Sequence, residues 1–351
     1  MRMLSQYFLA LGAFSIVALG AGCADSDTKT DTGTGTGTGT DTGTDTDTDT
    51  GTDTDTGTDT DTDTDVAEVR IDVAGFYPEG VAIDAASNTL FVGSFGTGAV
   101  YRASLTDGLA SELVAPFGLG GVLAGLKVAD GALWACVNPA DVSVEASRLV
   151  KVDPETGEAL ASYTLSLYTF CNDLVRAPSG DVYVTDSFQS LIFRLPAGGS
   201  ALEVWFSDAA YAPAPGSFGF NGIEMAPDAS AVLVGRADTG EIVRVPVESD
   251  GAAGPATTDT MPGPVSYGGV DGMVWSGDEL LAVRDYQVVS LTASGTTWSS
   301  TLVDATLDAP TTVAVDSDGG VWVVESQFSK LFDGDDSTNG VAPYRVVRVR
   351  R

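Results

Sequence analysis

The sequence predicts an all-β protein whose globular part is a six-bladed β-propeller. Six segments repeat one pattern of apolar strand, turn, second apolar strand, turn and third strand. The repeats recur at intervals of roughly 40 to 50 residues, which is the size of a four-stranded blade. No stretch of the chain has a convincing 3.6-residue hydrophobic period, so we expect strands rather than helices to build the core.

The first repeat lies within residues 77–105, where three β-patterned runs are separated by polar and glycine turns. Branched and aromatic residues alternate along the second strand of each repeat, so each sheet is expected to pack against its neighbour. The other five repeats span residues 125–137, 172–195, 221–245, 271–291 and 310–326.

The two ends of the globular part also have the composition of strands, VAEVRIDV at 66–73 and YRVVRV at 344–349. An unpaired sheet edge invites association with other chains. We therefore expect these two strands to lie in the same sheet, where they complete the last blade and close the ring.

The N-terminus has the features of an export signal. Arg2 precedes an apolar run, Leu4 to Leu19, that is too short and too close to the start to be a stable membrane span. Small residues and then Cys23 follow, an arrangement that resembles a bacterial lipoprotein signal. Residues 1–22 are then the signal peptide, and Cys23 carries the lipid that anchors the chain to the cell envelope, at the outer membrane. The alternative is ordinary cleavage near Gly22 and secretion.

Residues 23–65 are predicted to be a disordered tether. From position 25 to 65 the chain is almost entirely Thr, Asp and Gly, with thirteen Asp against one Lys. No apolar face exists to be buried, and the like charges repel one another, so the segment cannot offset its ordering entropy. As a flexible coil it would span roughly 35 Å. Residues 66–351 then form the propeller.

Charge and composition exclude several functions. The formal net charge is −32, and residues 66–351 keep −21 of it once the tether's Asp and Lys residues and Arg2 are set aside. A surface this acidic argues against nucleic acid and anionic lipid as partners. The chain has no histidine, which excludes a Ser–His–Asp triad and His-ligated zinc sites. We expect a monomer that binds a small molecule.

The candidate site follows from propeller geometry. Residues just before the first strand and just after the second strand of each blade crowd one mouth of the central channel. The first set comprises Glu79, Asn172, Asp173, Asn221 and Asp271, and the second comprises Ser94, Asn138, Asp186, Arg236, Arg284 and Glu325. Oxygen ligands that converge from several blades suit a hard divalent cation. The alternative is that Asn and Asp only shape turns before strands.

Two cysteines remain besides Cys23. Cys136 and Cys171 fall at blade ends on the same predicted face of neighbouring blades. An exported protein can form a disulfide, so they either pair or remain two buried free thiols.

The motifs PEGVAID, NDLVRAPSG, FNGIEMAPD and VDGMVWS resemble the family of gluconolactonase, senescence marker protein and luciferin-regenerating enzyme, which are six-bladed propellers. The resemblance covers residues 76 to 326. It implies a divalent cation, calcium first and zinc, magnesium or manganese as alternatives. Its ligands would be Glu79, Asn221 and Asp271, with Asn172 on the substrate side as a further ligand. The family often has an arginine at the position of Phe170.

The resemblance implies a metal-dependent hydrolase of sugar or other lactones, with Asp271 as ligand and catalytic base. Asp173 and Asp186 are alternative bases, because a metal-bound carboxylate is a weak one. Asn172, Asp186, Arg236 and Arg284 are candidate substrate contacts, although the two arginines could instead pair with Asp238 and Asp285. The competing hypothesis is a non-catalytic propeller, similar to the NHL type, that binds a ligand or a protein.

Overall fold

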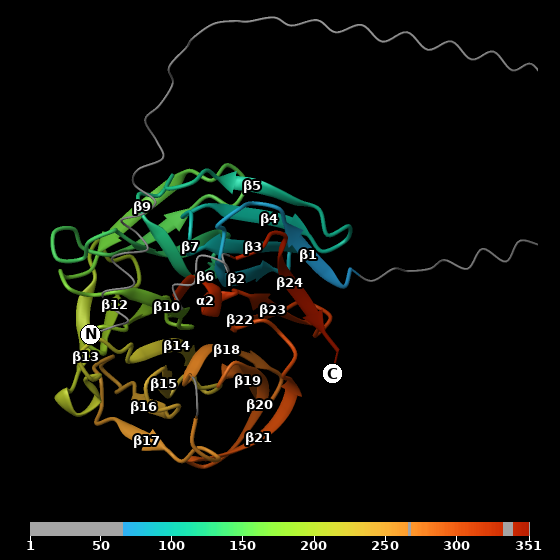
Figure 1. Ribbon diagram of the computed structural model, residues 1–351. Coiled ribbons are helices and arrows are strands. Elements are labelled where there is room, and N and C mark those ends of the chain that lie inside the picture. Colours follow the sequence, from blue (N-terminus) through green and yellow to red (C-terminus); the bar gives the residue numbers. More distant parts are fainter. Residues whose placement is uncertain (1–65, 266–267, 333–339, 351) are drawn as a thin grey trace, which may run out of the picture. The chain divides into compact units, whose positions relative to one another are not determined.

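The computed structural model describes residues 66–265, 268–332 and 340–350, which form six four-stranded sheets arranged in a ring (Figure 1). The predicted six-bladed propeller is confirmed. The predicted signal peptide, Cys23 and the tether lie outside the described residues. Within the described ranges, no helix has the length and apolar character needed to cross a membrane.

Each blade is an antiparallel meander that runs outwards from the axis. The innermost strands are β2 (Pro78–Asp84), β6 (Val122–Ala129), β10 (Cys171–Arg176), β14 (Phe220–Met225), β18 (Val270–Ser276) and β22 (Pro310–Val315). The second strands are β3 (Thr89–Ser94), β7 (Ala132–Asn138), β11 (Val182–Asp186), β15 (Ala231–Arg236), β19 (Glu279–Arg284) and β23 (Val321–Glu325).

The outer half of each blade is built in the same order. The third strands are β4 (Val100–Ser104), β8 (Arg148–Val152), β12 (Leu191–Leu195), β16 (Ile242–Pro246), β20 (Gln287–Ser294) and β24 (Tyr344–Val349). The outermost strands are β5 (Ala110–Val114), β9 (Ala159–Thr164), β13 (Glu203–Ser207), β17 (Thr257–Asp259), β21 (Thr297–Asp304) and β1 (Glu68–Ile71). The described helices are short: the 3₁₀ turn η1 (Ala209–Tyr211) and α2 (Phe328–Phe332).

The last blade takes its outermost strand from the start of the domain. β1 pairs antiparallel with β24, so that Glu68 lies opposite Val347 and Ile71 opposite Tyr344. The innermost strands β2 and β22 also contact each other. The predicted closure of the ring is therefore confirmed, and it leaves no blade incomplete.

Six hydrophobic clusters form the core, one at each interface between neighbouring blades. In β19, Leu280 and Ala282 pack towards the preceding blade, and Leu281 and Val283 pack towards the following one. Because successive side chains of a strand point to opposite faces, both faces of each sheet are buried. This explains why the second strands are almost wholly apolar.

Candidate functional site

A β-bulge occurs at the same place in each innermost strand. In β2, Pro78 pairs with Ser94 and Val81 with Val92, so Glu79 and Gly80 together lie opposite one residue. The other five innermost strands have the same two-against-one pairing. We call the first bulge residues the mouth ring: Glu79, Ala124, Asn172, Asn221, Asp271 and Thr311. Because a bulge bends its strand and redirects side chains, it accounts for where these six residues point.

The second bulge residue is glycine in four of the six blades, and the reason is close packing. A Cβ atom on Gly80 would lie 2.3 Å from the carbonyl oxygen of Ala124, and one on Gly222 would lie 2.1 Å from that of Asp271. Only glycine allows the neighbouring backbone to approach so closely. In the Glu-Gly, Asn-Gly and Asp-Gly pairs of the sequence, the first residue is thus the polar bulge residue and the second is the glycine that close packing requires.

All six residues of the mouth ring line one cavity of about 300 Å³. Glu79, Asn172 and Asn221 are buried. The structure therefore brings together all four residues that the sequence assigned to the cation.

The two carboxyl groups of the mouth ring share an unfavourable electrostatic environment. Burial, followed by the charges of Asp271 and Asp173, raises the pKa of Glu79 well above the usual range of a carboxyl. Burial and the charge of Asp173 raise the pKa of Asp271 to about 8, although hydrogen bonds from the Gly272 N–H and the Asn221 side chain oppose the shift. Both shifts favour the protonated form of these carboxyl groups.

Two oxygen atoms of the mouth ring also lack hydrogen-bond partners. Glu79 Oε2 and Asn221 Oδ1 are buried and accept no hydrogen bond within the described part of the chain. A buried polar atom without a partner costs about 1–3 kcal/mol, so such atoms call for an explanation.

A hard cation fits these residues. Carboxylate and amide oxygens are the ligands that calcium and magnesium prefer. The described residues contain no group of three or more His, Cys, Asp and Glu side chains that could hold a metal ion. A cation here would consequently depend on the amides of Asn172 and Asn221 and on water, besides the carboxylates of Glu79 and Asp271.

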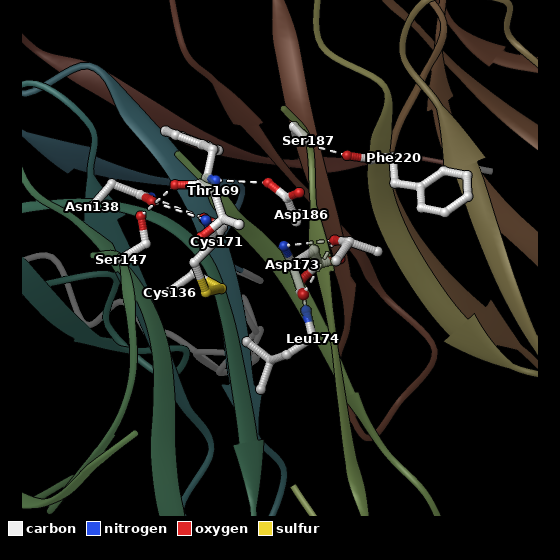
Figure 2. The surroundings of a disulfide bond; sticks show 12 residues. Cys136, Asn138, Ser147, Thr169, Cys171, Asp173, Leu174, Asp186, Ser187 and Phe220 are labelled. Carbon is white, nitrogen blue, oxygen red and sulfur yellow. Dashed lines mark hydrogen bonds between the residues drawn. A yellow bond between two sulfur atoms is a disulfide. The ribbon is translucent and has the colours of Figure 1, made fainter. Parts of the chain in front are cut away.

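A disulfide and a polar side chain hold the blade that carries Asn172 (Figure 2). Cys136 of β7 is bonded to Cys171 of β10, 35 residues away in the sequence, which resolves the choice that the sequence left open. Closing a loop of this length stabilises a fold by about 4 kcal/mol. The Asn138 amide donates to the Cys171 carbonyl at 2.8 Å and accepts from the Cys171 N–H at 2.9 Å. The backbone next to Asn172 is thus fixed.

The residues at the ends of the second strands have a different role from the mouth ring. Asp186 accepts hydrogen bonds from the backbone N–H groups of Phe170, Phe188 and Gln189, and it does not line the cavity. Burial raises its pKa to about 6 against the effect of these bonds. In Figure 2 its carboxylate is directed at the backbone beside Thr169.

The two arginines that were candidate substrate contacts also lie outside the cavity lining. Arg236 forms an ion pair with Asp238 at 2.6 Å, as in the alternative interpretation of the sequence. Arg284 donates to the backbone carbonyls of Gly240 and Gly263. Their guanidinium groups therefore hold loops at the rim.

Deeper along the channel, the innermost strands enclose a second cavity of about 100 Å³, lined in part by Lys127 and Asp173. Lys127 of β6 forms an ion pair with Glu224 of β14 across 97 positions of sequence. Burial alone would lower the pKa of Lys127, but the charges of Glu224 and Asp173 raise it. We call Lys127, Asp173 and Glu224 the lysine cluster.

Asp173, the second bulge residue of β10, directly follows Asn172 and so connects the mouth ring to the lysine cluster. It accepts hydrogen bonds from the N–H groups of Leu174 and Ile223. Burial raises its pKa to about 6, and Lys127 is the strongest opposing influence. Sequence reasoning missed Lys127 and Glu224, although each is the single charged residue of its innermost strand, which is a signal in itself.

Sequence reasoning also missed the upper wall of the 300 Å³ cavity, which is aromatic. The wall residues come from separate loops and from α2: Phe95, Phe170, Phe218, Tyr286, Phe328 and Phe332. We call these six residues the aromatic wall. No local pattern could have identified them, because they are spread over more than 200 positions of the chain.

A larger hollow of about 450 Å³ lies beside the cavity on the rim and shares Ser217 with it. Its one acidic lining residue among those described is Asp141, whose carboxylate is already bonded by the Ser143 N–H and hydroxyl groups. The smaller cavity is therefore the better candidate for a functional site.

Comparisons with known proteins bear on the fold. No family model matches the chain, and no curated protein matches its sequence. Among solved structures, regucalcin from Agrobacterium tumefaciens, a calcium-binding protein, is 17% identical, with 81% of this chain and 93% of that chain covered and a TM-score of 0.59.

Two further structures show the same likeness. A gluconolactonase from Xanthomonas campestris is 17% identical, with coverage of 81% and 89% and a TM-score of 0.58. The major Malassezia sympodialis allergen Mala s 1 is 14% identical, with coverage of 81% and 96% and a TM-score of 0.62. Regucalcin and the gluconolactonase belong to the group that the sequence motifs resemble. At these identities the likeness establishes the fold.

Proposed function

We propose that this protein is a divalent-cation-dependent lactone hydrolase, active as a monomer. Calcium is the expected cation, held by Glu79, Asn172, Asn221 and Asp271. The observation that carries the proposal is the convergence of two buried, unpartnered oxygens, Glu79 Oε2 and Asn221 Oδ1, with the Asp271 carboxyl on one cavity. The folds of a gluconolactonase and of calcium-binding regucalcin support it.

A cation bound there supplies Lewis acidity to an ester carbonyl and orients water. The chain's own contribution is to hold the lactone over the mouth ring and to move one proton. Asp271 accepts a proton from the attacking water, whose oxygen bonds to the carbonyl carbon. The ring C–O bond then breaks, and the proton passes to the ring oxygen, which leaves as a hydroxyl group.

Asp271 is favoured as the base by position rather than by basicity. Ligation of a cation lowers the pKa of a carboxyl and weakens it as a base. The two alternative bases are less well placed, because Asp186 is bonded to backbone N–H groups and Asp173 lines the deeper cavity. Glu79, the other carboxyl of the mouth ring, is a further group able to share the proton, whereas the Asp238 carboxylate is paired with Arg236.

The test is lactone opening by the purified protein, stripped of metal and reloaded with calcium, zinc, magnesium or manganese. We expect one bound cation per chain and cation-dependent opening of lactones, both lost in Asp271→Ala. Bound cation without any hydrolysis on a broad lactone panel would instead favour the non-catalytic binding propeller. Absence of both cation and hydrolysis would contradict the proposed function altogether.

Export and lipid anchoring at Cys23 are part of the proposal, with the outer membrane as the location. They rest on the N-terminal apolar run, the small residues before Cys23 and the charged tether that follows. Cys23→Ala should move the protein from the membrane fraction to the soluble fraction of the cell envelope. Retention of the Cys23→Ala protein in membranes would contradict anchoring at this residue.

A further inference from the structure

The upper and lower halves of the 300 Å³ cavity differ in chemistry. The floor is the mouth ring, with its carboxyl and amide groups. The upper half is the aromatic wall, contributed by loops next to β3, β10, β14 and β19 and by α2. A substrate whose carbonyl reaches the floor must therefore place its remaining atoms against aromatic rings.

The five phenylalanines of the aromatic wall form a packed assembly and are not separate side chains. The ring centroids of Phe95 and Phe328 lie 5.1 Å apart, those of Phe170 and Phe218 5.6 Å apart, and those of Phe328 and Phe332 5.3 Å apart. Phe95 also contacts Phe170 and Phe332. Rings in contact at these distances brace one another in their orientations, so the wall is formed before a ligand enters.

Besides the Tyr286 hydroxyl, the described polar side chains that line the cavity above the floor are Ser217 and Asp238. In the floor itself, the Thr311 hydroxyl already donates to the Glu79 carbonyl. The carboxylate of Asp238 is held by Arg236. The two predicted substrate-binding arginines, Arg236 and Arg284, do not line the cavity.

This arrangement discriminates between substrates. A sugar lactone carries hydroxyl groups on most of its ring carbons, and each one placed against the aromatic wall loses hydrogen bonds to water without replacement. An alkyl or phenyl group in the same place gains from leaving water. The cavity volume lies at the lower end for ligand pockets, so it suits one ring and a short substituent.

We infer that the aromatic wall makes this protein selective for lactones that carry an apolar alkyl or phenyl substituent over polyhydroxylated sugar lactones. This inference rests on the proposed lactonase function and adds the substrate class. Phe218 and Phe332 are suitable positions for testing the inference, because they line the cavity and are only partly buried in the core.

The experiment compares kcat/KM of the calcium-loaded protein for three lactones with the same ring size: phenyl-substituted δ-valerolactone, unsubstituted δ-valerolactone and glucono-δ-lactone. We expect the phenyl-substituted compound to exceed the sugar lactone by about 10-fold or more, a difference of ~1.4 kcal/mol. Phe218→Ala and Phe332→Ala should each lower the ratio of substituted to unsubstituted lactone by about 10-fold. Phe332→Leu, which keeps an apolar side chain, should recover part of the loss.

The matched control is Phe117→Ala, which removes an exposed phenylalanine that does not line the cavity. Equal or faster opening of glucono-δ-lactone would overturn the inference. So would a substrate ratio that Phe218→Ala and Phe332→Ala change no more than Phe117→Ala does. Melting temperatures of all variants identify any that fail to fold.

Binding of the corresponding lactams, which resist hydrolysis, separates this inference from the proposed function. If no lactone is opened, but the phenyl lactam binds about 10-fold more tightly than the polyhydroxylated lactam and Phe218→Ala removes the difference, the selectivity stands and the hydrolase function fails. If no lactone is opened and the lactams do not differ, both are overturned.

Discussion

The mouth ring lies on all six innermost strands and the lysine cluster on three of them, β6, β10 and β14. The two groups differ in whether their buried carboxyl groups have a basic partner. In the lysine cluster, the carboxylates of Glu224 and Asp173 share an internal cation, Lys127. In the mouth ring, Glu79 and Asp271 line one cavity whose described lining residues include no basic side chain, and both have raised pKa values.

The difference indicates which layer serves structure and which serves function. A buried carboxylate that the chain neutralises itself needs no ligand. A pair of buried carboxyls that the chain leaves uncompensated costs stability, and such strain is typical of sites that bind or react. The fold therefore tolerates an unfavourable mouth ring directly next to the lysine cluster, where the chain supplies the compensating charge itself. Asn172 and Asp173, neighbours in one bulge, belong to the two groups.

The largest expected effect is on activity, and it distinguishes the mouth ring from the lysine cluster. Glu79→Gln should abolish stoichiometric cation binding and lower kcat/KM for lactones by about 10³-fold, or ~4 kcal/mol, because a ligand to the cation is lost. The same substitution in the lysine cluster, Glu224→Gln, should change kcat/KM by less than about 3-fold. Metal analysis and steady-state kinetics provide the two measurements, and similar losses in both variants would contradict the division of roles.

The next effect is on stability and is expected in the lysine cluster. Lys127→Met should lower the free energy of unfolding by about 2–3 kcal/mol, because it leaves Glu224 and Asp173 without their cation. The value is at the low end for buried pairs since the Lys127 side chain is 30% exposed. Urea unfolding should show that Lys127→Met combined with Glu224→Gln recovers most of the loss. A double variant no more stable than the single one would show that the ion pair is not the cause.

A smaller effect is expected from pH. The pKa of Asp271 is about 8 in the folded, cation-free protein, against about 3.9 in an unfolded chain. The folded state thus retains a proton that the unfolded state releases, and stability should fall as the pH rises through this interval.

Between pH 5 and pH 8 the chelated protein should lose stability, and its melting temperature should fall by several degrees. Asp271→Asn should flatten this dependence, and calcium should reverse it. Thermal unfolding in the presence of a chelator gives the measurement. A melting temperature that rises over this range would show that the carboxyls of the mouth ring are not protonated as described.

The smallest effect should come from Asp173→Asn, because this residue of the lysine cluster acts on the mouth ring only through its charge. Its charge contributes to the raised pKa values of both Glu79 and Asp271. Its removal lowers the negative potential at the mouth ring, so the calcium Kd should rise about 5-fold, or ~1 kcal/mol. Calorimetry can measure this shift, and an unchanged Kd would assign Asp173 to the lysine cluster alone.

Much of the site was predictable because it is encoded locally. Glu79, Asn221 and Asp271 each stand before a glycine at the start of an apolar run, and the bulge uses both residues of the pair. Asp186, Arg236 and Arg284 were placed at the same mouth from strand order alone. Their side chains instead bind loop backbone or an adjacent carboxylate, and that choice depends on loop conformations that strand order does not specify.

The sequence by itself determined the all-β class, the number of blades, the closure of the ring by its two terminal strands and the four carboxyl and amide residues of the mouth ring. All of these follow from short-range periodicity repeated six times. Only the tertiary structure decided the Cys136–Cys171 bond, the Lys127–Glu224 ion pair and the aromatic wall. Each of these joins residues from different blades, and whether such residues meet depends on how the blades pack around the axis, which no local pattern records.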